Sequence, residues 1–179
     1  MQGLFADLFE RLERPLHPDR GVRTDDSILL IYPPERELDF REQLVDAFLP
    51  RLRAARIPFT HLDLTGFLFH DLDPGDVEQL QEDEFDDYRW MRQGLSQRVE
   101  AALVRQFQAL TSAAPGATLL VSATVALHPL VRYGEVLRGL RDLKGRIALA
   151  FPGTERGGKL HFMNQPDGGN YLAVKLFWR

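Results

Sequence analysis

The amino-acid sequence predicts a three-layer α/β domain: a mainly parallel sheet with helices on both faces and an antiparallel hairpin at its C-terminal edge. A strand–helix–strand pattern over residues 27–64 is typical of parallel pairing. Two further short apolar runs, at 118–123 and 146–151, are bounded by turn residues, as buried strands are. Amphipathic helical spacing fills much of the chain between these strands.

The chain begins with a short amphipathic helix, predicted over residues 3–13. Its apolar side chains fall on one stripe: Leu4, Phe5, Leu8, Phe9 and Leu12. We expect the stripe either to dock on the core of its own domain or to meet a partner, and we take it as a candidate interaction surface. The acidic and mixed polar face disfavours binding to anionic lipid.

A polar loop at 15–26 leads into the first strand–helix–strand unit: a buried strand at 27–32, a helix at 37–55 and a strand at 57–64. Pro50 lies inside the helical pattern, so a kink or break is expected there. We expect the two strands to pair with each other through a right-handed crossover.

The middle of the chain predicts a short helix at 65–71 and a long helix at 76–112, followed by a strand at 118–123. Pro129 is tolerated at the first position of a helix, so the pair His128–Pro129 predicts a helix start. This helix is expected to run to about residue 143, with the next strand at 146–151. The last two strands, 160–163 and 171–178, are expected to form the antiparallel hairpin around the turn 166–169.

Length and composition indicate a single soluble domain. The chain has 179 residues, of which 44% are hydrophobic and 27% charged, as in ordinary globular proteins. The absence of cysteine excludes disulfides and thiolate zinc sites and fits a cytoplasmic protein. There is no apolar run near the ~20 residues that span a bilayer, and we expect neither a secretory signal nor membrane association.

The net charge of −4 is unevenly distributed. Residues 132–179 hold nine Lys or Arg against four acids, a balance of +5, whereas residues 1–131 hold thirteen against twenty-two, a balance of −9. The basic C-terminal third could contact phosphates or an acidic partner. The segment 71–87 holds nine Asp or Glu and no Lys or Arg; its spacing does not fit a calcium loop, and we interpret it as a solvated helix start or a surface for a basic partner.

Residues 153–159, from Gly153 to Lys159, superficially match a phosphate-binding loop. That motif requires Ser or Thr after the lysine, to ligate magnesium, and a helix whose N–H groups hold the phosphate. Here Leu160 follows, and the next residues read as a short apolar strand. The pattern therefore favours a strand-to-strand connection that uses glycine for positive φ.

The order of motifs from His128 to Trp178, "HPLVRYGEVLRGL", "ALAFPGTERGGKL" and "NYLAVKL", resembles the C-terminal signature of the BrxB family of BREX phage-defence systems. The resemblance covers about fifty residues, and Leu172 with Ala173 departs from the family pattern. The matching positions are Pro129, Leu130, Arg132, Leu137, Pro152, Gly153 and Tyr171. The resemblance implies a defence role exercised through protein partners, with no enzymatic activity.

No catalytic constellation is recognisable in the sequence. The five histidines make no helical i, i+4 pair, and there is no G-x-S-x-G nucleophile motif. Ser122 and Thr124 lie at the C-terminal end of a predicted parallel strand, where ligands usually bind in such sheets, which leaves a small-molecule pocket open. Arg132 is predicted in the first turn of a helix, where a cation opposes the helix dipole unless a carboxylate or phosphate lies nearby.

We therefore expect a non-enzymatic adaptor of a BREX complex, with no catalytic residue, cofactor or metal. The family setting implies other BREX proteins as partners, foremost the phosphatase-like PglZ, and at most an indirect association with phage or host DNA. The candidate interaction residues come from the N-terminal helix, the Gly-rich turn and the positions that match the family signature: Leu4, Phe5, Leu8, Phe9, Arg132, Pro152, Gly153, Lys159 and Tyr171. Two alternatives remain: a nucleotide-binding switch or weak NTPase that uses 153–159, and a nucleic-acid accessory that uses the basic third.

Overall fold

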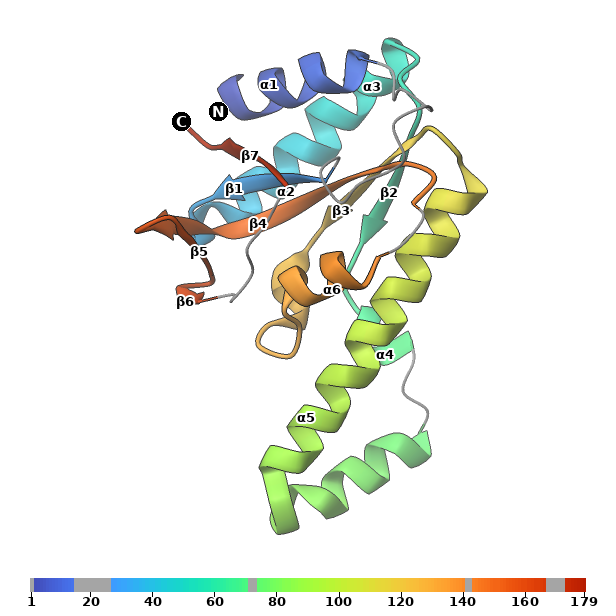
Figure 1. Ribbon diagram of the computed structural model, residues 1–179, viewed down its shortest axis with the longest axis vertical. Helices are drawn as coiled ribbons and strands as arrows, with labels where there is room; N and C mark the ends of the chain where they lie inside the picture. The colour runs from blue at the N-terminus through green and yellow to red at the C-terminus, as the bar shows by residue number, and fades with distance from the viewer. Residues whose placement is uncertain (1, 15–26, 71–73, 141–142, 167–172) are drawn as a thin grey trace.

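The computed structural model describes residues 2–14, 27–70, 74–140, 143–166 and 173–179; for residues 2, 74 and 76–91 it describes the backbone alone. It confirms the predicted α/β class, with a mostly parallel sheet between helices (Figure 1). None of the described helices is long and apolar enough to cross a membrane.

The main sheet has the strand order β2-β3-β4-β1-β7, and each neighbouring pair is parallel. Its strands are β1 (Ile28–Tyr32), β2 (Phe59–Asp63), β3 (Thr118–Ser122), β4 (Arg146–Arg156) and β7 (Val174–Phe177). Strands β1 and β3 are buried at every residue, as expected where helices cover both faces of a parallel sheet.

Helices cover the two faces of the sheet in separate groups. One face packs against α1 (Gln2–Glu13) and the consecutive segments α2 (Glu37–Glu42), η3 (Gln43–Phe48) and α3 (Leu49–Ala54). The other packs against α5 (Pro74–Ala113) and α6 (Tyr133–Gly139). Three shorter helices lie in connections: η2 (Pro34–Arg36), α4 (Phe67–His70) and η4 (Thr124–Leu127).

Helix α5 has 40 residues and is much longer than the strands that it packs against. Its C-terminal part packs on the sheet, and its N-terminal part extends away from the body of the domain (Figure 1). The two chain ends lie close together on the opposite side, where α1 contacts β7.

The expected pairing of the first two strands is wrong. Strands β3 and β4 lie between β2 and β1, and β1 instead pairs with β4 and β7. The physical reason lies in the two sequences. The ILLIY run of β1 is apolar throughout and is buried at the centre, whereas the FTHLD run of β2 carries polar residues and tolerates a half-buried edge.

The helix does not break at Pro50; it continues through a π-helical segment that precedes the proline. Residues Gln43–Phe48 have π-type bonding, and the N–H of Leu49 donates to the carbonyl of Leu44. Because proline has no N–H, the helix must change its bonding at this point, and a π turn absorbs the change without ending the helix.

The C-terminal antiparallel hairpin exists, but it is built from other strands than expected. Strand β4 continues beyond the sheet and pairs with β5 (Lys159–Phe162), which pairs with β6 (Gln165–Pro166). Gly157 and Gly158 form the connection with φ values of 57° and 74°, as a two-residue type I′ turn requires. The final strand β7 is not part of a hairpin but runs parallel to β1.

Helix α6 begins later and ends earlier than predicted. The His128–Pro129 bond is cis, and residues 128–130 form a turn in which the carbonyl of Leu127 accepts the N–H groups of Leu130 and Val131. The chain enters the helix at Tyr133, with Arg132 as its extended N-cap residue, and leaves it after Gly139.

The apolar stripe of α1 belongs to the core of the domain. Leu4 and Leu8 are fully buried, and Phe5 stacks on Phe40 at a centroid distance of 5.3 Å. Phe9 is half-buried beneath the guanidinium of Arg51. The stripe therefore docks on its own sheet, and Leu4, Phe5 and Leu8 are not available to a partner.

Truncation of this stripe should lower the free energy of unfolding. We expect Leu8→Ala to cost about 2–5 kcal/mol, the usual loss for a buried leucine. Glu10→Ala, on the exposed face of the same helix, should change stability by no more than about 0.5 kcal/mol. Urea unfolding followed by circular dichroism measures both free energies of unfolding. A loss in Leu8→Ala as small as that in Glu10→Ala would show that α1 is not part of the cooperative core.

Candidate functional site

The segment that resembled a phosphate loop is a β-hairpin. Gly153 lies within β4, where a Cβ atom would sit 2.1 Å from the carbonyl oxygen of His161, so glycine is needed for close strand approach. Lys159 is exposed and begins β5 rather than a helix. The N–H cradle of a phosphate loop is therefore missing from 153–159.

Two candidate interaction residues of strand β4 are buried and do not reach the surface. Pro152 and Gly153 are buried, and the carbonyl of Pro152 accepts the N–H of Met163 at 2.9 Å. Tyr171 and Leu172 lie outside the described residues, as do the side chains of the acidic run at its described positions 76–87.

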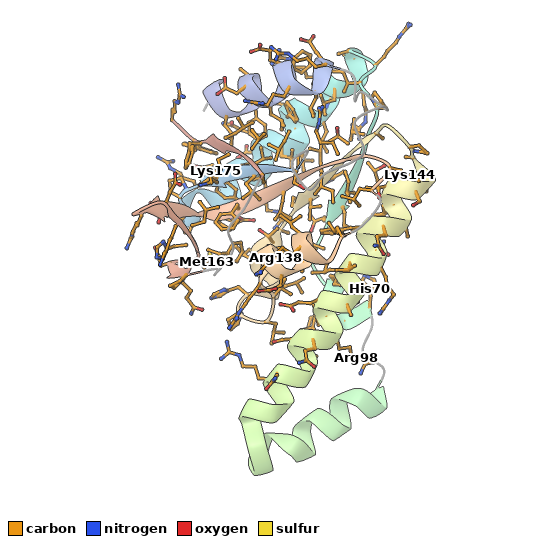
Figure 2. The ribbon with its side chains drawn as sticks, in the orientation of Figure 1. His70, Arg98, Arg138, Lys144, Met163 and Lys175 are labelled. Carbon is orange, nitrogen blue, oxygen red and sulfur yellow. The ribbon has the colours of Figure 1, made fainter. Side chains whose placement is uncertain are left out.

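Several basic residues of the C-terminal third lie apart from one another or are paired with acids. Lys144 precedes β4 and Arg156 ends it, so the eleven-residue strand holds them near its opposite ends. Lys175 pairs with Glu155 at 2.7 Å, and Arg138 pairs with Glu135. Figure 2 shows Lys144, Arg138 and Lys175 well apart on the molecule. No continuous phosphate-binding stripe results from these described residues.

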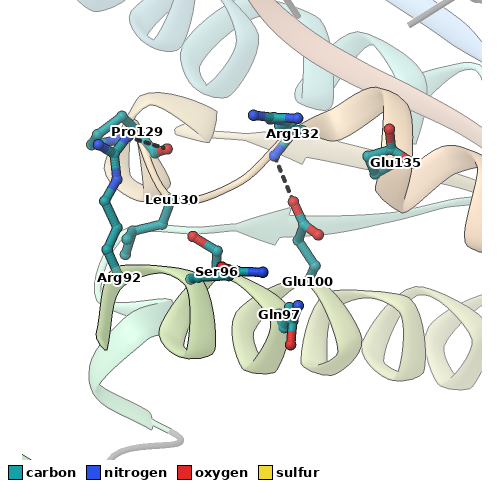
Figure 3. A pocket seen from close by; sticks show the side chains of 9 residues that line it. Arg92, Ser96, Gln97, Glu100, Pro129, Leu130, Arg132 and Glu135 are labelled. Atoms are coloured by element: carbon teal, nitrogen blue, oxygen red, sulfur yellow. Dashed lines mark hydrogen bonds between the residues drawn. The ribbon is translucent and has the colours of Figure 1, made fainter. Parts of the chain in front are cut away.

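Arg132 stands in a polar pocket of about 530 Å³ between α5 and the segment that leads into α6 (Figure 3). Helix α5 supplies one wall, and the turn around Pro129 together with the first residues of α6 supplies the other. The pocket is lined by Arg92, Gln93, Ser96, Gln97, Glu100, Pro129, Leu130, Arg132 and Glu135.

We call this site the Arg132 pocket. Its other charged side chains have bonding partners, and the guanidinium of Arg132 is available to a ligand. The backbone N–H of Arg132 donates to Glu100 Oε1 at 2.9 Å, which satisfies a donor at the start of α6. Glu135 is engaged by Arg138, and Arg92 donates to the carbonyl of Pro129 at 3.5 Å. The Arg132 side chain is exposed and makes no ion pair with any carboxylate that the structure describes.

The predicted position of Arg132 needs a small correction. The residue is the N-cap of α6, with φ −103° and ψ 101°, and not part of its first turn. The acidic group expected beside it is present as Glu100, but this carboxylate binds the backbone of Arg132 rather than its guanidinium.

Sequence reasoning missed a polar network at the carboxyl end of the sheet. His61 Nε2 lies 2.8 Å from Ser122 Oγ, and Arg41 pairs with Asp63 at 3.1 Å. In the same region Tyr32 donates to Glu37 Oε2 at 2.5 Å. These residues come from three strands and α2 and are up to about ninety positions apart in the chain, so local spacing gave no signal beyond the alternation of His61 and Asp63.

The inner end of the network is buried, whereas Arg41 and Asp63 are partly exposed. Ser122 and Thr124 are 1% and 0% exposed, and Thr124 donates to the carbonyl of Ala150 at 3.0 Å. The small-molecule pocket expected at these two residues is therefore closed. Within the described part of the chain, no group of three His, Asp or Glu side chains could hold a metal ion.

Burial sets the titration of the network. Partial burial lowers the pKa of His61, whose neutral form bonds to Ser122. Burial raises the pKa of Glu37, against the opposing effects of the Tyr32 hydroxyl and Arg41. Burial also acts to raise the pKa of Asp63, but hydrogen bonds from Thr65 and the charge of Arg41 outweigh it, and the pKa is lowered.

The lowered pKa of His61 should make stability pH-dependent. Between the ordinary histidine pKa, about 6.5, and the lower folded-state pKa, the unfolded chain binds the proton more readily. The contribution of His61 to the free energy of unfolding should thus be complete above pH 6.5 and fall as the pH is lowered through this window. In His61→Gln this component should disappear, while the similar contribution of His128, whose pKa burial also lowers, should remain.

Urea unfolding of both proteins from pH 8 to pH 5 measures the difference. Ser122→Ala should cost about 1–3 kcal/mol at pH 8, because His61 Nε2 loses its partner. Parallel pH profiles for wild type and His61→Gln would contradict the assignment.

Comparison of the chain with protein-family models, with curated proteins and with solved structures finds no match in any of the three.

Proposed function

We propose that this chain is a non-enzymatic, cytoplasmic protein-interaction component of a BREX phage-defence complex, with the phosphatase-like PglZ as its partner. The resemblance of residues 128–178 to the BrxB signature motivates the assignment. The single structural observation that supports it is the Arg132 pocket, because it places an exposed guanidinium from that signature in a concave surface.

The pocket suits recognition of a protein surface by contact. A guanidinium presents five donors in a planar fork, and it binds carboxylates through two parallel hydrogen bonds. Gln93, Gln97 and Ser96 add neutral polar groups along α5. Because Glu100 fixes the backbone of Arg132, the side chain projects from an anchored position, which lowers the entropy cost of binding.

The two alternative functions have less support. A nucleotide switch that uses 153–159 lacks the helix that would hold the phosphates, since the segment is a hairpin. A nucleic-acid accessory needs a basic stripe, whereas Lys144 and Arg156 lie near opposite ends of β4. Association with phage or host DNA is then indirect, through the complex.

Reversal of the charge at Arg132 should abolish partner retention. We expect Arg132→Glu to weaken binding to PglZ by at least about tenfold, since loss of one member of a buried charged pair costs about 2–5 kcal/mol. The measurement is co-purification with tagged PglZ, followed by titration in a biolayer assay. Arg156→Glu, which makes the same charge change on the exposed hairpin, is the matched control and should bind as the wild type does.

Two outcomes would contradict the proposal. One is a wild-type chain that retains none of the BREX proteins encoded beside it at micromolar concentration. The other is an equal loss of binding in Arg132→Glu and Arg156→Glu, which would assign the effect to net charge rather than to the Arg132 pocket.

A further inference from the structure

Strand β2 leaves one edge of the parallel sheet open. Among the described strands its single neighbour is β3, and all five of its residues are half-buried or exposed. The carbonyl of Pro58 accepts the N–H of Thr118, and the N–H of Leu64 donates to the carbonyl of Ser122. The backbone N–H and C=O groups of even-numbered residues therefore point toward β3. Because backbone groups alternate along a strand, Phe59, His61 and Asp63 point their N–H and C=O groups outward.

A groove runs beside this edge on the face covered by α5. Its volume is about 460 Å³, and it lies between β2, α4 and α5. Its lining is mixed: Leu62, Phe67, Ala102 and Ala109 are apolar, and Asp63, His70, Arg105 and Gln106 are polar. Phe69, on the bordering helix α4, is 74% exposed. Alternate side chains of a strand added to β2 would point into this groove.

The charges that border the edge are mostly positive and lack partners. Arg53 lies over the ring of Phe59, at 5.6 Å from its centroid, on the α3 side. Arg105 lines the groove on the α5 side. Neither makes an ion pair with a carboxylate of the described residues, whereas the acid at this edge, Asp63, is already paired with Arg41. On the α3 side, acids of a segment that lies along β2 would therefore meet the uncompensated positive charge of Arg53.

We propose that β2 accepts an extended segment of a partner protein as a sixth strand of the main sheet, and that this segment alternates small apolar and acidic residues. The outward backbone groups of Phe59, His61 and Asp63 supply the hydrogen bonds. The α5 groove takes the apolar side chains on one face of the segment, and Arg53 pairs with the acids on the other face. This site is separate from the Arg132 pocket and stands independently of the BREX assignment.

The test uses a fluorescein-labelled decapeptide that alternates valine and glutamate, with a valine–lysine decapeptide as its counterpart. Binding to the full chain is followed by anisotropy, and backbone protection by amide hydrogen exchange in NMR. We expect the glutamate peptide to bind and to slow exchange at Phe59, His61 and Asp63 by at least about tenfold. Exchange at Thr60 and Leu62, already bonded to β3, should not change.

The variant Arg53→Glu should weaken peptide binding by about tenfold or more. Arg156→Glu is the matched control and should bind the peptide as the wild type does. Arg53 is exposed, and an unchanged melting temperature shows that the variant folds.

Three results would overturn the proposal: no alternating protection along β2, equal binding of the lysine peptide, or protection of the same amides in a dimer of this chain without peptide. The last result would assign the edge to a second copy instead. Arg132→Glu should bind the peptide as the wild type does, even where it has lost PglZ binding. The two experiments therefore test the Arg132 pocket and the β2 edge independently.

Discussion

The burial of β4 between two neighbours and two helical layers determines the rest of the structure. Its residues 147–151 are fully buried, with Ala148 and Ala150 on one face and Ile147, Leu149 and Phe151 on the other. The small side chains let α1 and α2 approach closely, and Phe5, Phe40, Phe48 and Tyr32 fill the layer above them. The large ones form the core beneath α5 and α6. Both layers depend on this one strand.

The same strand relates the surfaces that we associate with binding. Beyond the sheet it forms the hairpin with β5, and Phe162 of that hairpin packs against Phe151 and Tyr133, which anchors the start of α6 and so the position of Arg132. Strand β3, on its other side, holds β2 at the edge. A single core thus presents an exposed guanidinium on one side and the open edge of β2 on another.

Local chemistry explains which expectations hold and which fail. The class, the strand positions and the glycine turn follow from apolar runs and backbone preferences that act over a few residues. The pairing of β1 with β2 fails because two later strands insert between them. The start of α6 at Pro129 fails because the carbonyl of Leu127 closes a turn there first. The expectation that the apolar stripe of α1 binds a partner fails because the stripe packs on the sheet of its own domain.

The sequence by itself determined the α/β class, the irregular helix around Pro50 and the lack of a phosphate-binding helix after Lys159, because proline, glycine and apolar periodicity restrict the chain locally. Only the tertiary structure decided the strand order, the contact of His61 with Ser122, the Arg132 pocket and the open edge of β2. Each of these depends on residues that lie far apart in the chain, and the burial of one common core brings them together or leaves them exposed.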